Sequence, residues 1–233
     1  SFKLIMHHDP YNARDNPKLF YAIHPHGAFC LGWSTLFCAF TQVKFCFSPA
    51  LFMSPFFRIF SRLTGNPGTA DKPSMIKYMK SNQDLALPPG GFEEATLTSL
   101  QHDRVYIKNR MGFVKLCLQY GYSIVPVYCF GENQTFWNIQ GWWNFRIKVL
   151  NKWGIPAILV WGLPLLPLVP KYSASLFVVT GPPIELPKLS QPTREQVQEW
   201  HTKYIQALEQ IYDDHKEEFY GKEIGKTKKL EIW

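Results

Sequence analysis

Apolar residues occur along this chain in two patterns, short continuous runs and longer segments with apolar positions three or four residues apart. The short runs are typical of buried strands, and the spaced pattern is typical of helices that bury one face. The runs predict strands at residues 19–23, 43–47, 85–87, 105–108, 124–129, 158–161 and 176–180. The spaced segments predict helices at residues 29–40, 55–63, 71–81 and 112–120, and a long helix from Thr193.

Because strands alternate with helices over the whole length, the pattern predicts an α/β fold in one domain, residues 1–233. We expect a mixed, partly parallel sheet flanked by helices. The last helix has the clearest start, because Gln196 three positions after Thr193 completes a capping box. Its apolar stripe indicates core packing and consists of Val197, Trp200, Tyr204, Leu208, Ile211 and Tyr212.

Composition adds to this picture mainly at the surface. Of the 233 residues, 46% are hydrophobic, 16% aromatic and 18% charged, which indicates a globular protein with a rather apolar surface. The composition excludes a disordered chain and a coiled coil. The formal net charge of +7 fits an anionic membrane surface or a phosphate-bearing ligand, and equally a solvated basic surface. Since the chain carries no nucleic-acid-binding motif, we expect no nucleic acid partner.

The five cysteines stand singly in apolar stretches, and none belongs to a Cys-x-x-Cys pair. This pattern indicates small core residues in a reducing compartment, with neither zinc ligation nor a disulfide framework. The longest uncharged stretches, residues 28–43 and 154–170, are shorter than the ~20 residues that a membrane-spanning helix needs. The sequence leaves open whether an anchoring segment precedes Ser1.

Two histidines flank a proline where the first predicted strand ends, in His24-Pro25-His26-Gly27. Strand ends that lead into helices are where α/β folds gather functional groups. An unperturbed imidazole has a pKa of about 6.5, so a histidine here can take a proton from an alcohol near neutral pH. Two histidines held by hydrogen bonds in a turn are an equal alternative.

Gly90, Gly91 and Glu94 follow the strand predicted at 85–87. Paired glycines allow backbone amides to point at an anion or a developing oxyanion, and a nearby carboxylate can orient an imidazole. Taken alone, these residues are better explained as a glycine turn followed by solvated glutamates.

Lys108, Asn109 and Arg110 stand at the junction of a predicted strand and a predicted helix. Such a junction suits a phosphate group, because cations and helix amides converge there. An exposed basic turn is the alternative. Further along, Glu132 follows the strand at 124–129 and is either a supporting residue of the site or a helix cap.

Together these segments resemble the diacylglycerol acyltransferase type 2 family, which includes monoacylglycerol acyltransferases and wax synthases. The resemblance follows the same order over nearly the whole chain. It rests on the tetrad at 24–27, on Gly90, Gly91 and Glu94, and on residues 108–113, 125–133, 181–187 and 204–232. Two departures stand out. Tyr21-Ala22-Ile23 replaces the usual Tyr-Phe-Pro, and neither histidine has the aspartate five positions later that related glycerolipid acyltransferases use.

The resemblance implies a glycerolipid-acyltransferase-like domain that moves an acyl group from coenzyme A to a lipid hydroxyl. His26 would be the general base, Glu94 would hold its imidazole and offset its charge, and His24 would support the pair. Gly90, Gly91 or a nearby amide would stabilise the oxyanion that forms at the thioester carbonyl.

The resemblance also implies the partners of the site. Acyl-CoA is the expected donor, with Lys108, Asn109 and Arg110 on its phosphates, and we expect no cofactor and no metal. The expected acceptor is diacylglycerol, which gives triacylglycerol. Monoacylglycerol, a lysophospholipid or a long-chain alcohol are alternatives, as is a member that binds lipid without turnover.

The same resemblance implies attachment to the endoplasmic reticulum or another intracellular membrane, with the site facing a reducing compartment. Tryptophans are concentrated in residues 136–153, which would rest in the lipid headgroup region or, equally, pack in the core. A homo-oligomer is left open.

Overall fold

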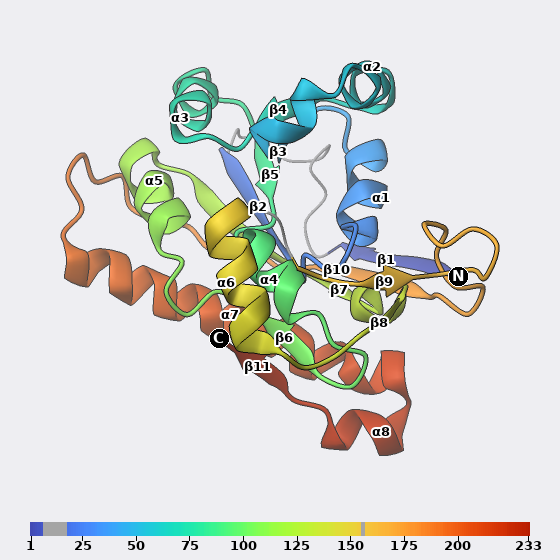
Figure 1. The fold of residues 1–233 in the computed structure, drawn as a ribbon. Coiled ribbons are helices and arrows are strands. Elements are labelled where there is room, and N and C mark those ends of the chain that lie inside the picture. Colours follow the sequence, from blue (N-terminus) through green and yellow to red (C-terminus); the bar gives the residue numbers. More distant parts are fainter. Residues whose placement is uncertain (7–17, 155–156) are drawn as a thin grey trace.

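A computed structural model describes residues 1–6, 18–154 and 157–233. Its main sheet has seven strands in the order β1-β10-β7-β2-β5-β3-β4 (Figure 1). Only the β10–β7 pair is antiparallel among the neighbouring pairs of this sheet, so the predicted mixed, partly parallel sheet is confirmed. The strands are β1 (Phe2–Met6), β2 (Leu19–His24), β3 (Lys44–Phe47), β4 (Pro67–Thr69), β5 (Leu85–Leu87), β7 (Ser123–Phe130) and β10 (Leu176–Thr180).

Helices and two small strand pairs complete the described part of the chain. The strand pairs are β6 (Asp103–Val105) with β11 (Leu230–Ile232), and β8 (Trp137–Asn138) with β9 (Val160–Trp161). The α-helices are α1 (Leu31–Ala39), α2 (Pro55–Thr64), α3 (Lys72–Lys80), α4 (Gly91–Leu97), α5 (Gly112–Tyr120), α6 (Trp143–Trp153), α7 (Arg194–Tyr220) and α8 (Lys222–Thr227). Two short 3₁₀ helices, η1 (Pro49–Met53) and η2 (Glu132–Gln134), lie between them. No helix of the described residues is long and apolar enough to cross a bilayer.

The alternation of side chains along β2 divides the core into two layers. Leu19, Tyr21 and Ile23 pack toward α1, whereas Phe20 and Ala22 pack toward α3, α5 and α7. Figure 1 shows the same division, with α1 on one side of the sheet and α5 and α7 on the other. Because successive strand residues face opposite ways, the next even position, His24, turns toward the α5 and α7 side.

Most predicted elements occur in the structure, several with the expected ends. The helix at 112–120 and the strand at 176–180 match residue for residue. The capping box of α7 is also confirmed, with the side chains of Thr193 and Gln196 each bonded to the backbone of the other.

Other predicted elements were wrong or missed. The strand expected at 105–108 lies instead at Asp103–Val105, where it pairs with β11. Helices α4 and α6 were not predicted, because neither has a capping side chain at its start and both follow glycine-containing turns.

Candidate active site

His24 is completely buried at the end of β2, and its ring is held by Glu94 of α4. Nδ1 of His24 lies 2.9 and 3.0 Å from the two carboxylate oxygens of Glu94. The other side of the ring packs near Tyr204 of α7, with the ring centroids 6.3 Å apart. The histidine and the carboxylate therefore form a dry, fixed pair at the end of the central strands.

The Glu94 carboxylate also organises the surrounding backbone. It accepts a hydrogen bond of 2.6 Å from the amide of His26 and one of 2.7 Å from the amide of Tyr106. A carboxylate with several donors is a strong acceptor, so this buried charge is well compensated. One side chain thus joins the tetrad at the end of β2 to the segment that follows β6.

The prediction that Glu94 holds the imidazole of His26 was wrong in its geometry. Glu94 holds the ring of His24, and it contacts His26 through the backbone amide. The physical reason is the alternation along β2, which turns His24 toward α4, while the chain has already left the strand at His26. A carboxylate in this position still lies close enough to raise the pKa of His26 electrostatically.

The His26 imidazole is half-buried and lies beside Phe92, with the ring centroids 6.1 Å apart. Its Nδ1 lies 3.0 Å from the carbonyl oxygen of Gly27, which can only accept a hydrogen bond. The proton therefore sits on Nδ1, and Nε2 carries the lone pair. Desolvation lowers the pKa of His26, and the hydrogen bond to Gly27 and the charge of Glu94 oppose this effect. The ring is consequently neutral, with a basic Nε2, near pH 7.

The turn after the tetrad is fixed by a second buried carboxylate, Glu132 of η2. It accepts hydrogen bonds from the amides of Leu31 (3.0 Å) and Gly32 (2.7 Å), the first two residues of α1. A Cβ on Gly27 would lie 2.5 Å from the Glu132 side chain, so glycine is required there. Burial raises the pKa of Glu132 to about 7, although the two amides favour the charged form. Of the two predicted roles, the contacts favour the helix cap.

Gly90 and Gly91 shape the turn that carries Glu94. A Cβ on Gly90 would lie 2.1 Å from the Glu94 carboxylate, and Gly91 has a φ of +59°, which favours glycine. The amide of Gly91 donates to the carbonyl of Pro88 at 3.2 Å, so it is bonded within the turn. The role of these glycines that the contacts support is close packing around Glu94.

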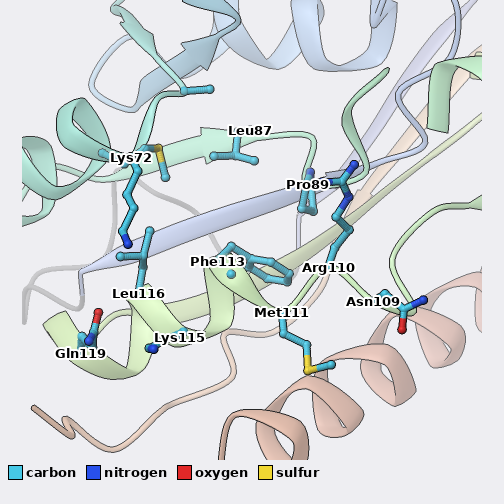
Figure 2. Close-up of a pocket in the computed structure, with 13 residues that line it drawn as sticks. Lys72, Leu87, Pro89, Asn109, Arg110, Met111, Phe113, Lys115, Leu116 and Gln119 are labelled. Atoms are coloured by element: carbon cyan, nitrogen blue, oxygen red, sulfur yellow. The ribbon is translucent and has the colours of Figure 1, made fainter. Parts of the chain in front are cut away.

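A cavity of about 520 Å³ lies between α3 and α5, next to the start of α4 (Figure 2). Asn109 and Arg110, two of the three residues expected to contact phosphate, line it, whereas Lys108 is exposed and lies outside its lining. Two further cations line this cavity and were not predicted from the sequence, Lys72 at the start of α3 and Lys115 of α5. They come from separate helices, so no linear motif joins them to Arg110.

Arg110 connects the cavity to the turn that carries Glu94. Its guanidinium forms an ion pair with Glu93 and lies over the ring of Tyr106, 5.4 Å from the centroid. Glu93 and Glu94 are therefore clearly separated by their contacts, because the first pairs with Arg110, which lines the cavity, and the second contacts the histidines.

The fold is similar to that of a solved acyltransferase. The crystal structure of the 1-acyl-sn-glycerophosphate (LPA) acyltransferase PlsC from Thermotoga maritima matches with a TM-score of 0.52, over 90% of this chain and 72% of that one. Sequence identity is 12%, so this likeness concerns the fold alone.

The sequence defines the family. The family model described as "Diacylglycerol acyltransferase" matches residues 2–232, and the chain belongs to this family. This confirms the resemblance inferred from the motifs.

Among curated relatives, Diacylglycerol O-acyltransferase 2 of Danio rerio is 30% identical over 90% of this chain and 64% of its own length. Acyl-CoA wax alcohol acyltransferase 2 of Homo sapiens is 27% identical over 90% of the chain and 68% of its own length. 2-acylglycerol O-acyltransferase 3 of Homo sapiens is 30% identical over 83% and 63%, respectively. The chain thus spans about two thirds of the length of these relatives.

Proposed function

We propose that this protein is an acyl-CoA-dependent O-acyltransferase that esterifies the hydroxyl of a neutral lipid, with diacylglycerol as the first acceptor to test. The observation that carries the proposal is the buried His24–Glu94 pair, which fixes the amide of His26 and leaves its Nε2 basic. Membership of the diacylglycerol acyltransferase family supports the same reaction class.

In the proposed mechanism, Nε2 of His26 takes the proton of the acceptor hydroxyl while its oxygen attacks the thioester carbonyl. The carbonyl π electrons move to oxygen and form a tetrahedral intermediate. When the intermediate collapses, the C–S bond breaks, and the departing thiolate receives the proton from the imidazolium of His26. Glu94 favours the cationic imidazole through its charge and holds the tetrad through His24, so it acts as a positioning residue.

The cavity between α3 and α5 is the proposed binding site of the donor nucleotide. Coenzyme A carries a diphosphate and a 3′-phosphate, and Lys72, Arg110 and Lys115 offer three positive charges along one cavity. Arg110 would exchange its ion pair with Glu93 for a phosphate. Since Pro89 also lines the cavity and precedes the turn that carries Glu94, the thioester can reach toward the tetrad from there.

The neutrality of the proposed acceptor rests on the relatives, whose names specify diacylglycerol, a wax alcohol and 2-acylglycerol. Such acceptors reside in bilayers, so we place the reaction at the surface of the endoplasmic reticulum or another intracellular membrane. The free thiols of all five cysteines fit a reducing compartment on that side.

The test is an assay of the purified protein with labelled acyl-CoA and a panel of acceptors: diacylglycerol, monoacylglycerol, a long-chain alcohol and a lysophospholipid. We expect labelled ester with at least one neutral acceptor, diacylglycerol first, and none with the lysophospholipid. Calorimetry with free coenzyme A gives an independent measurement of donor binding. Bound lipid without ester formation or coenzyme A binding would contradict the proposal and favour a lipid-binding member of the family.

A further inference from the structure

The loop after β9, residues 162–172, exposes more apolar surface than a loop in water normally does. Leu165 and Tyr172 are 93% and 92% exposed, and Leu168 is 72% exposed. Trp137 and Trp161, a register pair of the β8–β9 sheet, continue this surface at its base. We call these residues together with Leu166 the β9 face. Apolar patches of this kind mark binding surfaces rather than ordinary solvent-exposed loops.

Several backbone amides of this loop are hydrogen-bonded within it. The amides of Leu163, Leu166 and Val169 donate to carbonyls inside the loop, at 2.9 to 3.1 Å. The amide of Lys171 donates to the carbonyl of Thr135. A Cβ on Gly162 would lie 1.6 Å from the carbonyl oxygen of Val169, so the tight turn of the loop requires glycine there. The apolar side chains are thus presented on a fixed frame.

Proline removes further backbone donors from the same loop. Pro164, Pro167 and Pro170 have no N–H group, and the amides of Gly162, Leu163, Leu166 and Val169 are bonded within the loop, so in residues 162–170 only the amides of Leu165 and Leu168 lack a backbone acceptor. An unsatisfied N–H is far more costly in a lipid layer than in water. A loop with so few free donors is better suited to the surface of a lipid layer than an ordinary loop is.

The sequence segment that contains the β9 face carries positive charges and no negative ones. Between Glu132 and Glu185 the chain contains no aspartate or glutamate, and Lys171 lies in the loop itself, whereas Arg146, Lys148 and Lys152 belong to α6. Lys171 lies near the end of the loop, with its ammonium 4.1 Å from the centroid of the Trp137 ring. Tryptophan and lysine side by side are typical of the boundary between acyl chains and headgroups. The charge favours a surface of anionic lipids over a second copy of this basic chain.

We propose that the β9 face docks on an anionic lipid bilayer, with Leu165 and Leu168 inserted among the upper acyl chains and Lys171 at the phosphate level. Figure 1 shows this loop extending from the molecule beside the N-terminus, away from α8 at the lower end. Insertion of this kind is shallow and needs no spanning helix. The inference deepens the proposed function, because a neutral lipid acceptor has to be taken from a bilayer.

The test measures binding of the full chain to sedimented vesicles of phosphatidylcholine alone or with phosphatidylserine. We expect the double variant Leu165→Ser, Leu168→Ser to bind at least about tenfold more weakly, since each leucine buries a full side chain. Lys171→Gln should weaken binding about fivefold, and only with phosphatidylserine present. Ile224→Ser, at an exposed apolar position of α8, is the matched control and should bind like the parent protein.

Equal binding of the double variant and the parent protein would overturn the proposal. Sedimentation velocity without vesicles tests whether the face instead binds a second copy of the chain. If the parent protein is an oligomer, the double variant is not, and both bind vesicles equally, the face is a self-association surface and the proposal is overturned. Transfer from a short-chain acyl-CoA to a short soluble alcohol, without vesicles, separates docking from catalysis. The double variant should keep this activity. A parent protein that binds vesicles through this face but is inactive in every acyl-transfer assay would contradict the proposed function and not the docking face.

Discussion

Two buried glutamates, Glu94 and Glu132, flank the histidine tetrad, and they have different partners. Glu94 binds an imidazole ring and two amides, one of them in the tetrad itself. Glu132 binds the first two amides of α1 and lies against Gly27. Both carboxylates are almost completely excluded from solvent, so burial alone does not distinguish them.

The difference lies in which groups each carboxylate can influence. Glu94 contacts the ring of one histidine and changes the pKa of the other, so its charge acts on groups that can move protons. Glu132 compensates helix amides, a role that serves the position of α1 and its entry turn. We therefore place the proposed chemistry on the Glu94 side of the tetrad and the support of the turn on the Glu132 side.

The largest expected effect is on the Glu94 side, at His26. His26→Ala removes the proposed general base and should lower kcat at least about a hundredfold, while the protein still folds. Because desolvation holds the pKa of His26 below 6.5, the kcat/KM of the parent protein should fall only below that pH. Steady-state kinetics with a pH series measures both. Near-normal turnover of the variant would exclude His26 as the base.

The second prediction separates Glu94 from its neighbour Glu93. Glu94→Gln places an NH₂ group against the amide of His26 or of Tyr106, so one charged hydrogen bond is lost and two donors face each other. The loss should lower kcat about ten- to hundredfold. Glu93→Gln, whose parent side chain contacts Arg110 at the cavity, should be mild and serves as the matched control.

A pH series distinguishes this positioning role from a merely structural one. The charge of Glu94 raises the pKa of His26, so its removal in Glu94→Gln should move the acidic limb of the kcat/KM profile to lower pH. An unchanged limb, or a larger effect of Glu93→Gln on kcat, would contradict the assignment of Glu94.

The sequence was enough to single out the tetrad and Glu94, since strand ends and glycine turns can be recognised in a linear pattern. It was not enough to pair them. β2 is buried on both faces, so its apolar run has no polar side from which the direction of His24 can be read. The pairing of Glu94 with the His24 ring depends on where α4 lies in space, and α4 itself begins without a capping side chain.

Outside the tetrad, too, features with a local sequence signal were predicted, and features that depend on packing were not. The helix at 112–120 was predicted to its last residue, because Gly121 at a φ of +68° ends it in the left-handed conformation that is common after helices. The cations of the cavity were only partly predicted, since Lys72 and Lys115 belong to different helices that meet through packing. The tryptophans of residues 136–153 also divide by packing: Trp142 is exposed, whereas Trp143 lies between Arg104 and Arg146.

A smaller effect is expected at the cavity, on binding of the donor. Arg110→Ala should raise the KM for acyl-CoA about tenfold, because a charge-assisted contact to a phosphate is lost. The kcat at saturating donor should change less, since the phosphates lie far from the reacting carbonyl. Lys108→Ala is the matched control, because Lys108 is exposed and outside the cavity lining. Equal KM values for the two variants would remove the cavity from donor binding.

The smallest change in activity is expected on the other side of the comparison, at Glu132. Glu132→Gln should keep kcat within about threefold of the parent value, since the residue contacts helix amides and no imidazole.

The effect of Glu132→Gln should appear in the free energy of unfolding. Burial raises the pKa of Glu132 from 4.5 to about 7 in the folded protein, so between these values the unfolded chain holds fewer protons. The free energy of unfolding of the parent protein therefore decreases as pH rises through this window, by on the order of 3 kcal/mol from this group. Glutamine does not titrate, so urea unfolding at pH 5 and pH 8 should show the variant gaining stability relative to the parent protein at the higher pH. A constant difference between the two proteins across this range, or a hundredfold loss of kcat, would show that Glu132 shares the role of Glu94.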